Sequence, residues 1–143
     1  MCGIAGIFDF KNVSASVSND YVLNSMAHRG PDACDVWESE NNKIKLFHTR
    51  LSIVDLTHNA NQPMDYKNRY KIVFNGEIYN YEILKKNLEK KGHIFNTSSD
   101  TEVILALYDE YSDSSFDMLE GIFAFAIYDL LKNKLIVCRD IFG

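Results

Sequence analysis

Apolar and polar residues along the first third of the chain indicate strands interrupted by one short helix. Cys2 to Phe10 is almost continuously small and apolar, which is typical of a strand covered on both faces. Ser18 to Met26 places apolar side chains at helical spacing, and Arg29 to Asp32 ends that helix because Pro31 disfavours a helical residue before it. Ile44 to Ile53 alternates, with an interruption from Phe47 to Arg50, and predicts one or two strands.

The middle of the chain predicts a strand followed by two helices. Tyr70 to Phe74 predicts a strand that ends at Asn75-Gly76, a turn signal. Residues 80–91 predict a helix capped by Asn80, and the capping-box spacing of Ser99 and Glu102 predicts another. We expect the inward faces to consist of Ile83, Leu84 and Leu88 in the first helix and of Val103, Ile104, Leu107, Tyr108 and Tyr111 in the second.

The last part of the chain predicts a β-hairpin. Its strands are Ile122 to Asp129 and Lys134 to Arg139, and Lys132-Asn133 lies at the turn. The order is therefore strands, two adjacent helices, and strands again. This order favours an α+β domain with antiparallel sheets over alternating βαβ units.

Composition narrows the classes of function. The 143 residues suffice for one domain with a core of its own, and 46% of them are hydrophobic. The net charge of −5 argues against a nucleic-acid or anionic-membrane surface. The longest apolar run, Ile122 to Tyr128, is too short to span a bilayer. No secretory signal pattern opens the chain, so we expect a cytoplasmic protein.

Cysteine and histidine spacing gives no indication of a metal site or a disulfide framework. The three cysteines include no CxxC pair, and the four histidines stand at no ligand-like spacing to them. A reducing compartment fits this pattern. We therefore expect no metal in this domain.

Cys2 is the first candidate for chemistry. Removal of Met1 would place a thiol and a free α-amine on one residue, with ordinary pKa values near ~8.5 and ~7.7–8.0, which suits proton exchange. A nucleophile and its base would then share Cys2. The alternative is a small buried residue at the start of a strand, which is commoner for an arbitrary cysteine.

Three further segments carry polar residues in unusual positions. Arg50 interrupts an apolar strand pattern and could clamp a carboxylate, or it could be an edge-strand surface charge. Asn75 and Gly76 offer a side-chain amide and a backbone N–H, the donors of an oxyanion hole, or they form an ordinary turn. Asp100 stands at a helix start, where it could hold an ammonium group or only complement the helix dipole.

Taken in order, the motifs resemble the glutamine-hydrolysing domain of asparagine synthetases, class II glutamine amidotransferases of the N-terminal-nucleophile hydrolase superfamily. The stretch from Arg50 to Met64 favours this branch over the sugar-phosphate and purine amidotransferases, although related proteins of polysaccharide and peptide biosynthesis share it. The motifs that carry the resemblance are Met1-Cys2-Gly3-Ile4-Ala5-Gly6, His28-Arg29-Gly30-Pro31-Asp32, Arg50-Leu51-Ser52-Ile53-Val54-Asp55-Leu56, Gln62-Pro63-Met64, Asn75-Gly76-Glu77-Ile78-Tyr79-Asn80, Ser99-Asp100-Thr101-Glu102 and Arg139-Asp140.

The resemblance implies a four-layer αββα sandwich of antiparallel sheets and assigns roles. Cys2 would attack the side-chain amide carbon of glutamine while its α-amine transfers the proton, and Asn75 and Gly76 would hold the oxyanion. Arg50 would bind the α-carboxylate of glutamine and Asp100 its α-ammonium. The remaining residues of the implied pocket are Leu51, Ser52, Ile53, Val54 and Glu77, and the implied gating loop consists of His28, Arg29, Gly30, Pro31 and Asp32.

The same resemblance implies a larger enzyme. Residues 1–143 would be a glutaminase domain that lacks its C-terminal strands, and the synthetase domain that binds ATP and magnesium is absent from this chain. No cofactor is expected in this domain, and the expected partners are glutamine, a synthetase domain in the same full-length chain and a second copy in a homodimer. Two alternatives stay open: an amidotransferase that delivers ammonia to another acceptor, and a catalytically silent glutamine-binding module.

Overall fold

The computed structural model describes residues 2–9, 17–52 and 58–142, and these form two antiparallel sheets. Sheet A has the order β1-β3-β2. Sheet B has the order β4-β5-β6-β7. The strands are β1 (Gly3–Phe8), β2 (Ala33–Glu38), β3 (Ile44–Arg50), β4 (Met64–Tyr66), β5 (Tyr70–Ile78), β6 (Gly121–Asp129) and β7 (Lys134–Arg139).

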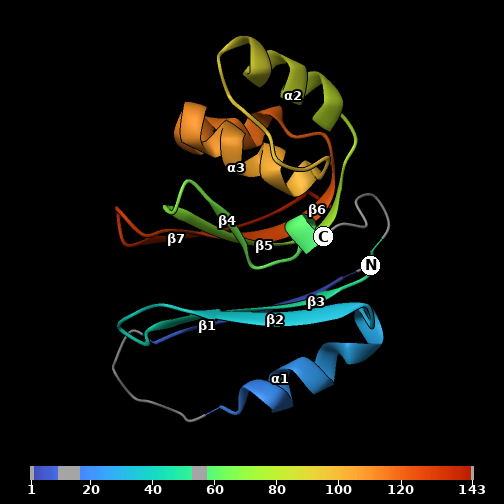
Figure 1. Ribbon diagram of the computed structural model, residues 1–143, viewed down its shortest axis with the longest axis vertical. Coiled ribbons are helices and arrows are strands. Elements are labelled where there is room, and N and C mark those ends of the chain that lie inside the picture. The colour runs from blue at the N-terminus through green and yellow to red at the C-terminus, as the bar shows by residue number, and fades with distance from the viewer. Residues whose placement is uncertain (1, 10–16, 53–57, 143) are drawn as a thin grey trace.

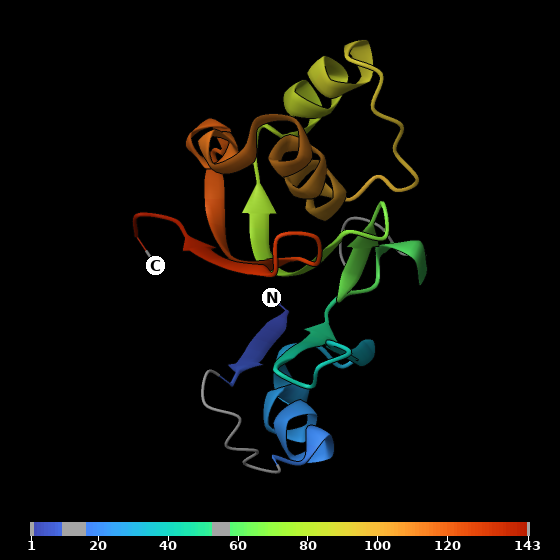
Figure 2. The same cartoon turned by 90° about the vertical axis from the view of Figure 1, so that its left-hand side faces the viewer.

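The helices cover the outer faces of the two sheets. Helix α1 (Asn19–Met26) lies on sheet A. Helix α3 (Asp100–Tyr111) lies on sheet B, and α2 (Tyr81–Lys90) packs against α3, as Figure 1 and Figure 2 show from two directions. The layers therefore run α1, sheet A, sheet B, and α2 with α3. This is the predicted αββα sandwich. Short 3₁₀ helices occupy Ala27–Arg29, His58–Ala60 and Ser112–Met118.

Alternation along the strands of sheet B builds two separate cores. In β6, Phe123, Phe125 and Ile127 pack into the cluster beneath α2 and α3. Their neighbour Tyr128 packs on the opposite face, in a smaller cluster between the sheets. This division follows from the period of two along a strand. Within each strand of sheet B, every second residue therefore faces the space between the sheets.

Three local expectations are wrong. Strand β5 does not end at Asn75-Gly76 but continues to Ile78, because Asn75 and Gly76 pair with Ala124 and Phe123 of β6. Ile83 is 65% exposed, since only Leu84 and Leu88 of α2 turn inward. The Asn80 side chain does not cap α2: its amide donates to the Met118 carbonyl and accepts from the Glu120 N–H.

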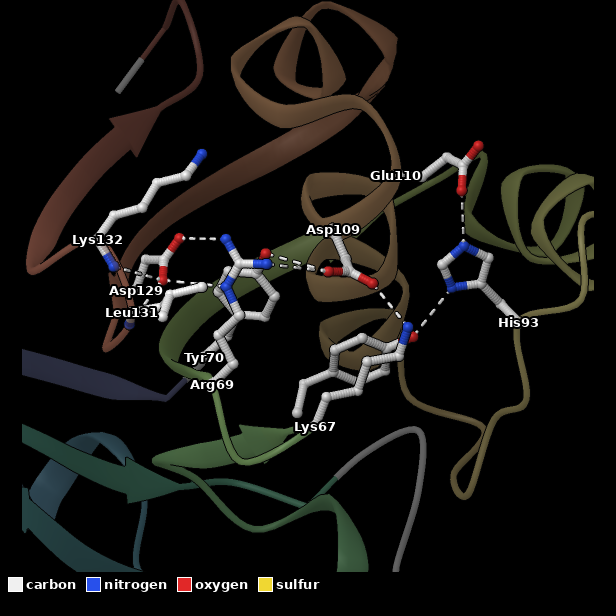
Figure 3. Close-up of polar contacts among 10 residues, drawn as sticks. Lys67, Arg69, Tyr70, His93, Asp109, Glu110, Asp129, Leu131 and Lys132 are labelled. Atoms are coloured by element: carbon white, nitrogen blue, oxygen red, sulfur yellow. Dashed lines mark hydrogen bonds and ion pairs between the residues drawn. The ribbon is translucent and has the colours of Figure 1, made fainter.

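A polar network joins α3 to sheet B at the end of the sheet away from the Asn75-Gly76 stretch (Figure 3). The buried Asp129 carboxylate accepts two hydrogen bonds from Arg69, at 2.9 and 3.1 Å. Although burial by itself raises the pKa of Asp129, the guanidinium brings that pKa below its ordinary value. Asp109 of α3 accepts from Lys67 at 2.7 Å and from the Tyr70 hydroxyl at 3.1 Å. These contacts fix α3 across the sheet.

Candidate functional site

Strand alternation directs the predicted polar side chains into the space between the sheets. In β3, Arg50 has the same parity as the buried core residue Leu46. In β5, Asn75 has the same parity as Val73 of that inter-sheet core. Cys2 directly precedes β1 and has the parity of Ile4, which packs on the same core. A period of two therefore explains why residues far apart in sequence meet.

These side chains share one cavity of about 180 Å³. It contains seven of the sequence-predicted pocket residues: Cys2, Arg50, Leu51, Asn75, Gly76, Glu77 and Asp100. Its remaining lining residues are Ala60, Gln62, Phe74, Ser99, Thr101 and Ile122. Ser52 is not among them, and the predicted pocket residues Ile53 and Val54 lie outside the described part of the chain.

The Cys2 thiol contacts the backbone at the end of β3. Its Sγ accepts a hydrogen bond from the Leu51 N–H at 3.4 Å and lies 3.7 Å from the Leu51 carbonyl oxygen. The carbonyl oxygen of Cys2 accepts a hydrogen bond from Arg29 Nε at 3.2 Å. Cys2 is half-buried, so the thiol is fixed yet remains open to the cavity.

Asn75 and Gly76 lie side by side on the wall of the cavity. The Asn75 side-chain oxygen is buried and has no hydrogen-bond partner among the described residues, so the acceptor of this amide is unused. Gly76 has a φ of +149°, and a Cβ at this position would lie 2.2 Å from the Ile122 carbonyl oxygen. Only glycine fits here, because β6 passes directly beside the backbone.

Asp100 begins α3 and is 7% exposed. Its carboxylate accepts a hydrogen bond from the Ile78 N–H at 3.0 Å. Burial raises the pKa of Asp100, although the backbone N–H groups of Ile78 and Thr101 oppose the shift. A buried carboxylate at a cavity wall is suited to a cationic ligand group, which would compensate for the lost solvation.

The capping of α3 is only partly as predicted. The Ser99 hydroxyl accepts from the Thr101 N–H at 3.2 Å, as an N-cap does. The Glu102 carboxylate does not accept a hydrogen bond from the Ser99 N–H, as it would in a capping box. Its carboxylate accepts instead from the N–H groups of Asn96 and Thr97, so it fixes the loop before the helix.

Arg50 is 7% exposed at the end of β3, so the edge-strand surface alternative does not hold. The Arg50 guanidinium donates to the Asn61 side-chain oxygen. Arg50 and Asp100 thus bring opposite charges to the same cavity. Such a pair is complementary to the carboxylate and the ammonium of one amino acid.

The predicted gating residues do not line the cavity: His28 and Arg29 belong to a 3₁₀ helix, and the Gly30 backbone after it is extended. Gly30 is buried, and a Cβ there would lie 2.4 Å from the Thr49 carbonyl oxygen. The Asp32 N–H donates to the Arg50 carbonyl, and the Asp32 carboxylate accepts from the Ser52 N–H at 2.7 Å. Of the remaining residues, His28 ends up exposed and Pro31 is likewise at the surface. The segment is therefore bonded to the strand end that carries Arg50.

His48 does not line the cavity. It is 1% exposed, and burial lowers its pKa from 6.5 to about 4 despite a hydrogen bond with the Phe74 backbone. His48 is consequently neutral at neutral pH.

Sequence reasoning assigned no role to two residues that organise the cavity. Gln62 lines it and bonds to both Phe74 and Thr101, and Asn61 holds Arg50. The only sequence signal for them was the Gln62-Pro63-Met64 motif, which carries no chemistry by itself.

Neither a metal cluster nor a membrane span occurs in the part of the chain that the structure describes. Over residues 2–9, 17–52 and 58–142, no group of three His, Cys, Asp or Glu side chains could hold a metal ion. Within the same ranges, no helix has the length and apolarity needed to cross a bilayer.

Comparison with known proteins places the chain in a family. Residues 1–143 match the model of the glutamine amidotransferase domain. Over its full length the chain is 42% identical to asparagine synthetase [glutamine-hydrolyzing] 3 of Bacillus subtilis and 39% identical to asparagine synthetase B [glutamine-hydrolyzing] of Escherichia coli. It covers 24% and 26% of these relatives, or about a quarter of their length.

The fold is also that of a solved amidotransferase. The structure of the glutamine phosphoribosylpyrophosphate amidotransferase of B. subtilis, complexed with ADP and GMP, superimposes with a TM-score of 0.72 at 24% identity. The match covers 97% of this chain and 36% of that one, and it shows that the two share a fold. With a family match over every residue, this chain belongs to the glutamine amidotransferase domain family.

Proposed function

We propose that this domain hydrolyses glutamine to glutamate and ammonia through a thioester on Cys2. The observation that carries the proposal is the shared cavity, which contains a cysteine thiol, two oxyanion donors and a pair of opposite charges. A structural cysteine would need none of these neighbours. A cavity of this size accommodates one amino acid more readily than a peptide or a nucleotide.

The charged pair orients the substrate. Arg50 binds the α-carboxylate of glutamine through its planar fork of donors, and Asp100 binds the α-ammonium group. With both ends of the amino acid held, the side-chain amide extends toward Cys2. Leu51 and Glu77 complete the wall around it.

The proposed reaction conserves atoms and protons. The α-amine that removal of Met1 exposes takes the proton of the Cys2 thiol, and the resulting thiolate attacks the amide carbon. Asn75 and Gly76 donate to the oxyanion, each donor contributing about 2.7–4 kcal/mol in comparable sites. The C–N bond breaks, the amine returns the proton to the leaving nitrogen, and ammonia departs. Water then attacks the thioester, and glutamate and the free thiol result.

The relatives support a proposal for the fate of the ammonia. They are about four times as long as this chain, and their names describe asparagine synthesis and glutamine hydrolysis. We infer that a synthetase domain in the same full-length chain, supplied with ATP and magnesium, uses the ammonia to amidate activated aspartate. Residues His28 to Asp32 would close the cavity during turnover, and their bonds to Cys2 and Ser52 support that role.

Glutamate release from glutamine tests the proposal. We expect the chain to form glutamate and Cys2→Ala to form none, while Cys34→Ala, which changes an exposed cysteine, retains the full rate. Hydroxylamine should trap γ-glutamyl hydroxamate from the thioester. Mass spectrometry should show that Met1 is removed. Turnover by Cys2→Ala, or by protein that retains Met1, would refute the mechanism.

A further inference from the structure

Gln62 is a buried residue in the cavity wall, and both the oxygen and the nitrogen of its side-chain amide form hydrogen bonds. It is 7% exposed. Its Oε1 accepts a hydrogen bond from the Phe74 N–H at 2.6 Å, and its Nε2 donates to the Thr101 hydroxyl at 3.3 Å. One side chain therefore connects β5 to the first turn of α3.

The position of Gln62 follows from the register of β4 on β5. The ladder ends where Met64 pairs with Ile72, and two residues further along the same register Gln62 faces Phe74. Pro63 between them carries no N–H. The Gln62 side-chain oxygen replaces a backbone carbonyl of a neighbouring strand as the acceptor that the buried Phe74 N–H requires.

A second connection lies four residues further along β5. The Ile78 N–H donates to Asp100, also in the first turn of α3. Phe74 and Ile78 immediately enclose Asn75, Gly76 and Glu77. The stretch that carries both oxyanion donors is therefore tied to the same helix turn at each end.

We propose that Gln62 is a positioning residue that holds the Asn75-Gly76 donor pair at a fixed distance from the amino-acid-binding turn of α3. The proposal rests on the glutaminase function argued above. Gln62 acts through the Phe74 backbone, so its loss displaces the donors more than it alters the binding of the substrate carboxylate or ammonium. Displacement of oxyanion donors lowers kcat.

Gln62→Leu tests this role, with Tyr70→Phe as the matched control. Gln62→Leu removes both hydrogen bonds of its buried side chain, and Tyr70→Phe removes the hydrogen bond of another buried side chain to Asp109, outside the cavity. We expect Gln62→Leu to lower kcat about 10–100-fold while KM for glutamine changes less than about threefold. Tyr70→Phe should lower the melting temperature comparably and leave kcat unchanged. Equal kcat in both variants would overturn the proposal.

Amide hydrogen exchange gives a readout that does not depend on turnover. We expect exchange at Phe74, Asn75 and Gly76 to be at least about tenfold faster in Gln62→Leu than in Tyr70→Phe. If the parent chain released no glutamate, the proposed function would fail, yet the exchange rates would still decide whether Gln62 holds this segment. Should Gln62→Leu not fold, Thr101→Val removes the second half of the connection, and unchanged exchange in that variant would refute the role.

Discussion

Arg29 donates a hydrogen bond from Nε to the carbonyl oxygen of Cys2 at 3.2 Å. Arg29 ends the 3₁₀ helix Ala27–Arg29 in the segment proposed to close the cavity. This contact involves only the backbone of Cys2, whereas the Cys2 thiol contacts the Leu51 N–H. The segment can therefore fix the orientation of Cys2 without occupying the cavity.

Arg29→Gln should slow turnover without unfolding the domain. The contact is exposed, so we expect kcat to fall only about three- to tenfold, in line with a weak charge-assisted hydrogen bond. The melting temperature should move by less than a few degrees. Steady-state kinetics and thermal unfolding of the same preparations measure both. An unchanged kcat would show that this contact does not orient Cys2.

Gly76→Ala should abolish activity. The new Cβ would meet the Ile122 carbonyl at 2.2 Å, so β5 and β6 must separate at the oxyanion donors. We expect kcat to fall by about a hundredfold or more. Gly92→Ala is the control, because Gly92 also has positive φ, +95°, but nothing lies within 4 Å of its Cβ position. That variant should lose a little stability and keep its kcat; equal losses in both would implicate strain alone.

Asp100→Asn should weaken glutamine binding. Asparagine keeps an acceptor oxygen for the Ile78 N–H but removes the charge that would face the substrate ammonium. We expect KM to rise about ten- to a hundredfold, the cost of one charged hydrogen bond, with a smaller change in kcat. Initial rates over a wide range of glutamine concentrations separate the two constants. A change confined to kcat would assign Asp100 a different role.

His48 should make the domain sensitive to acid. Its pKa is about 4 in the folded protein and 6.5 in the reference state, so the unfolded chain binds the proton first. Stability should therefore fall as pH drops from 6.5 toward 4, by about 3 kcal/mol, and His48 should contribute nothing above 6.5. Urea unfolding of the wild type and His48→Gln at several pH values isolates this contribution as a difference in slope. Parallel pH dependences would contradict the assignment.

Much of the fold was accessible from local pattern. The helix after Ser18, the helix capped by Ser99 and the final hairpin all formed as predicted, because each combines apolar periodicity with its own cap or turn. The Asn75-Gly76 turn failed because turn propensity is a local signal, whereas nine residue pairs with β6 hold β5 extended through this point. Strand β2 was missed since its exposed residues include Cys34 and Asp35 and its pattern does not alternate cleanly.

The site divides in a similar way. Alternation and motif order predicted which chemical groups occur, and Cys2, Arg50, Asn75 and Asp100 do line one cavity. Their catalytic roles stay predictions. The contacts of Gln62 could not be predicted, because they depend on where β4 stops against β5 and on how α3 lies over the sheet. Such information is tertiary and leaves no periodic trace in a single sequence.

The cavity is built from both sheets of the sandwich, since Cys2 directly precedes β1 and Arg50 ends β3 in sheet A, whereas Asn75 and Gly76 belong to sheet B. Neither sheet alone contains both the proposed nucleophile and the proposed oxyanion donors. Glutamine turnover would thus report on the alignment of two packed layers, and a state with intact strands but loosened sheets would be silent. On gradual unfolding, glutaminase activity would be lost before the secondary structure, so the activity would measure how well the two sheets are packed.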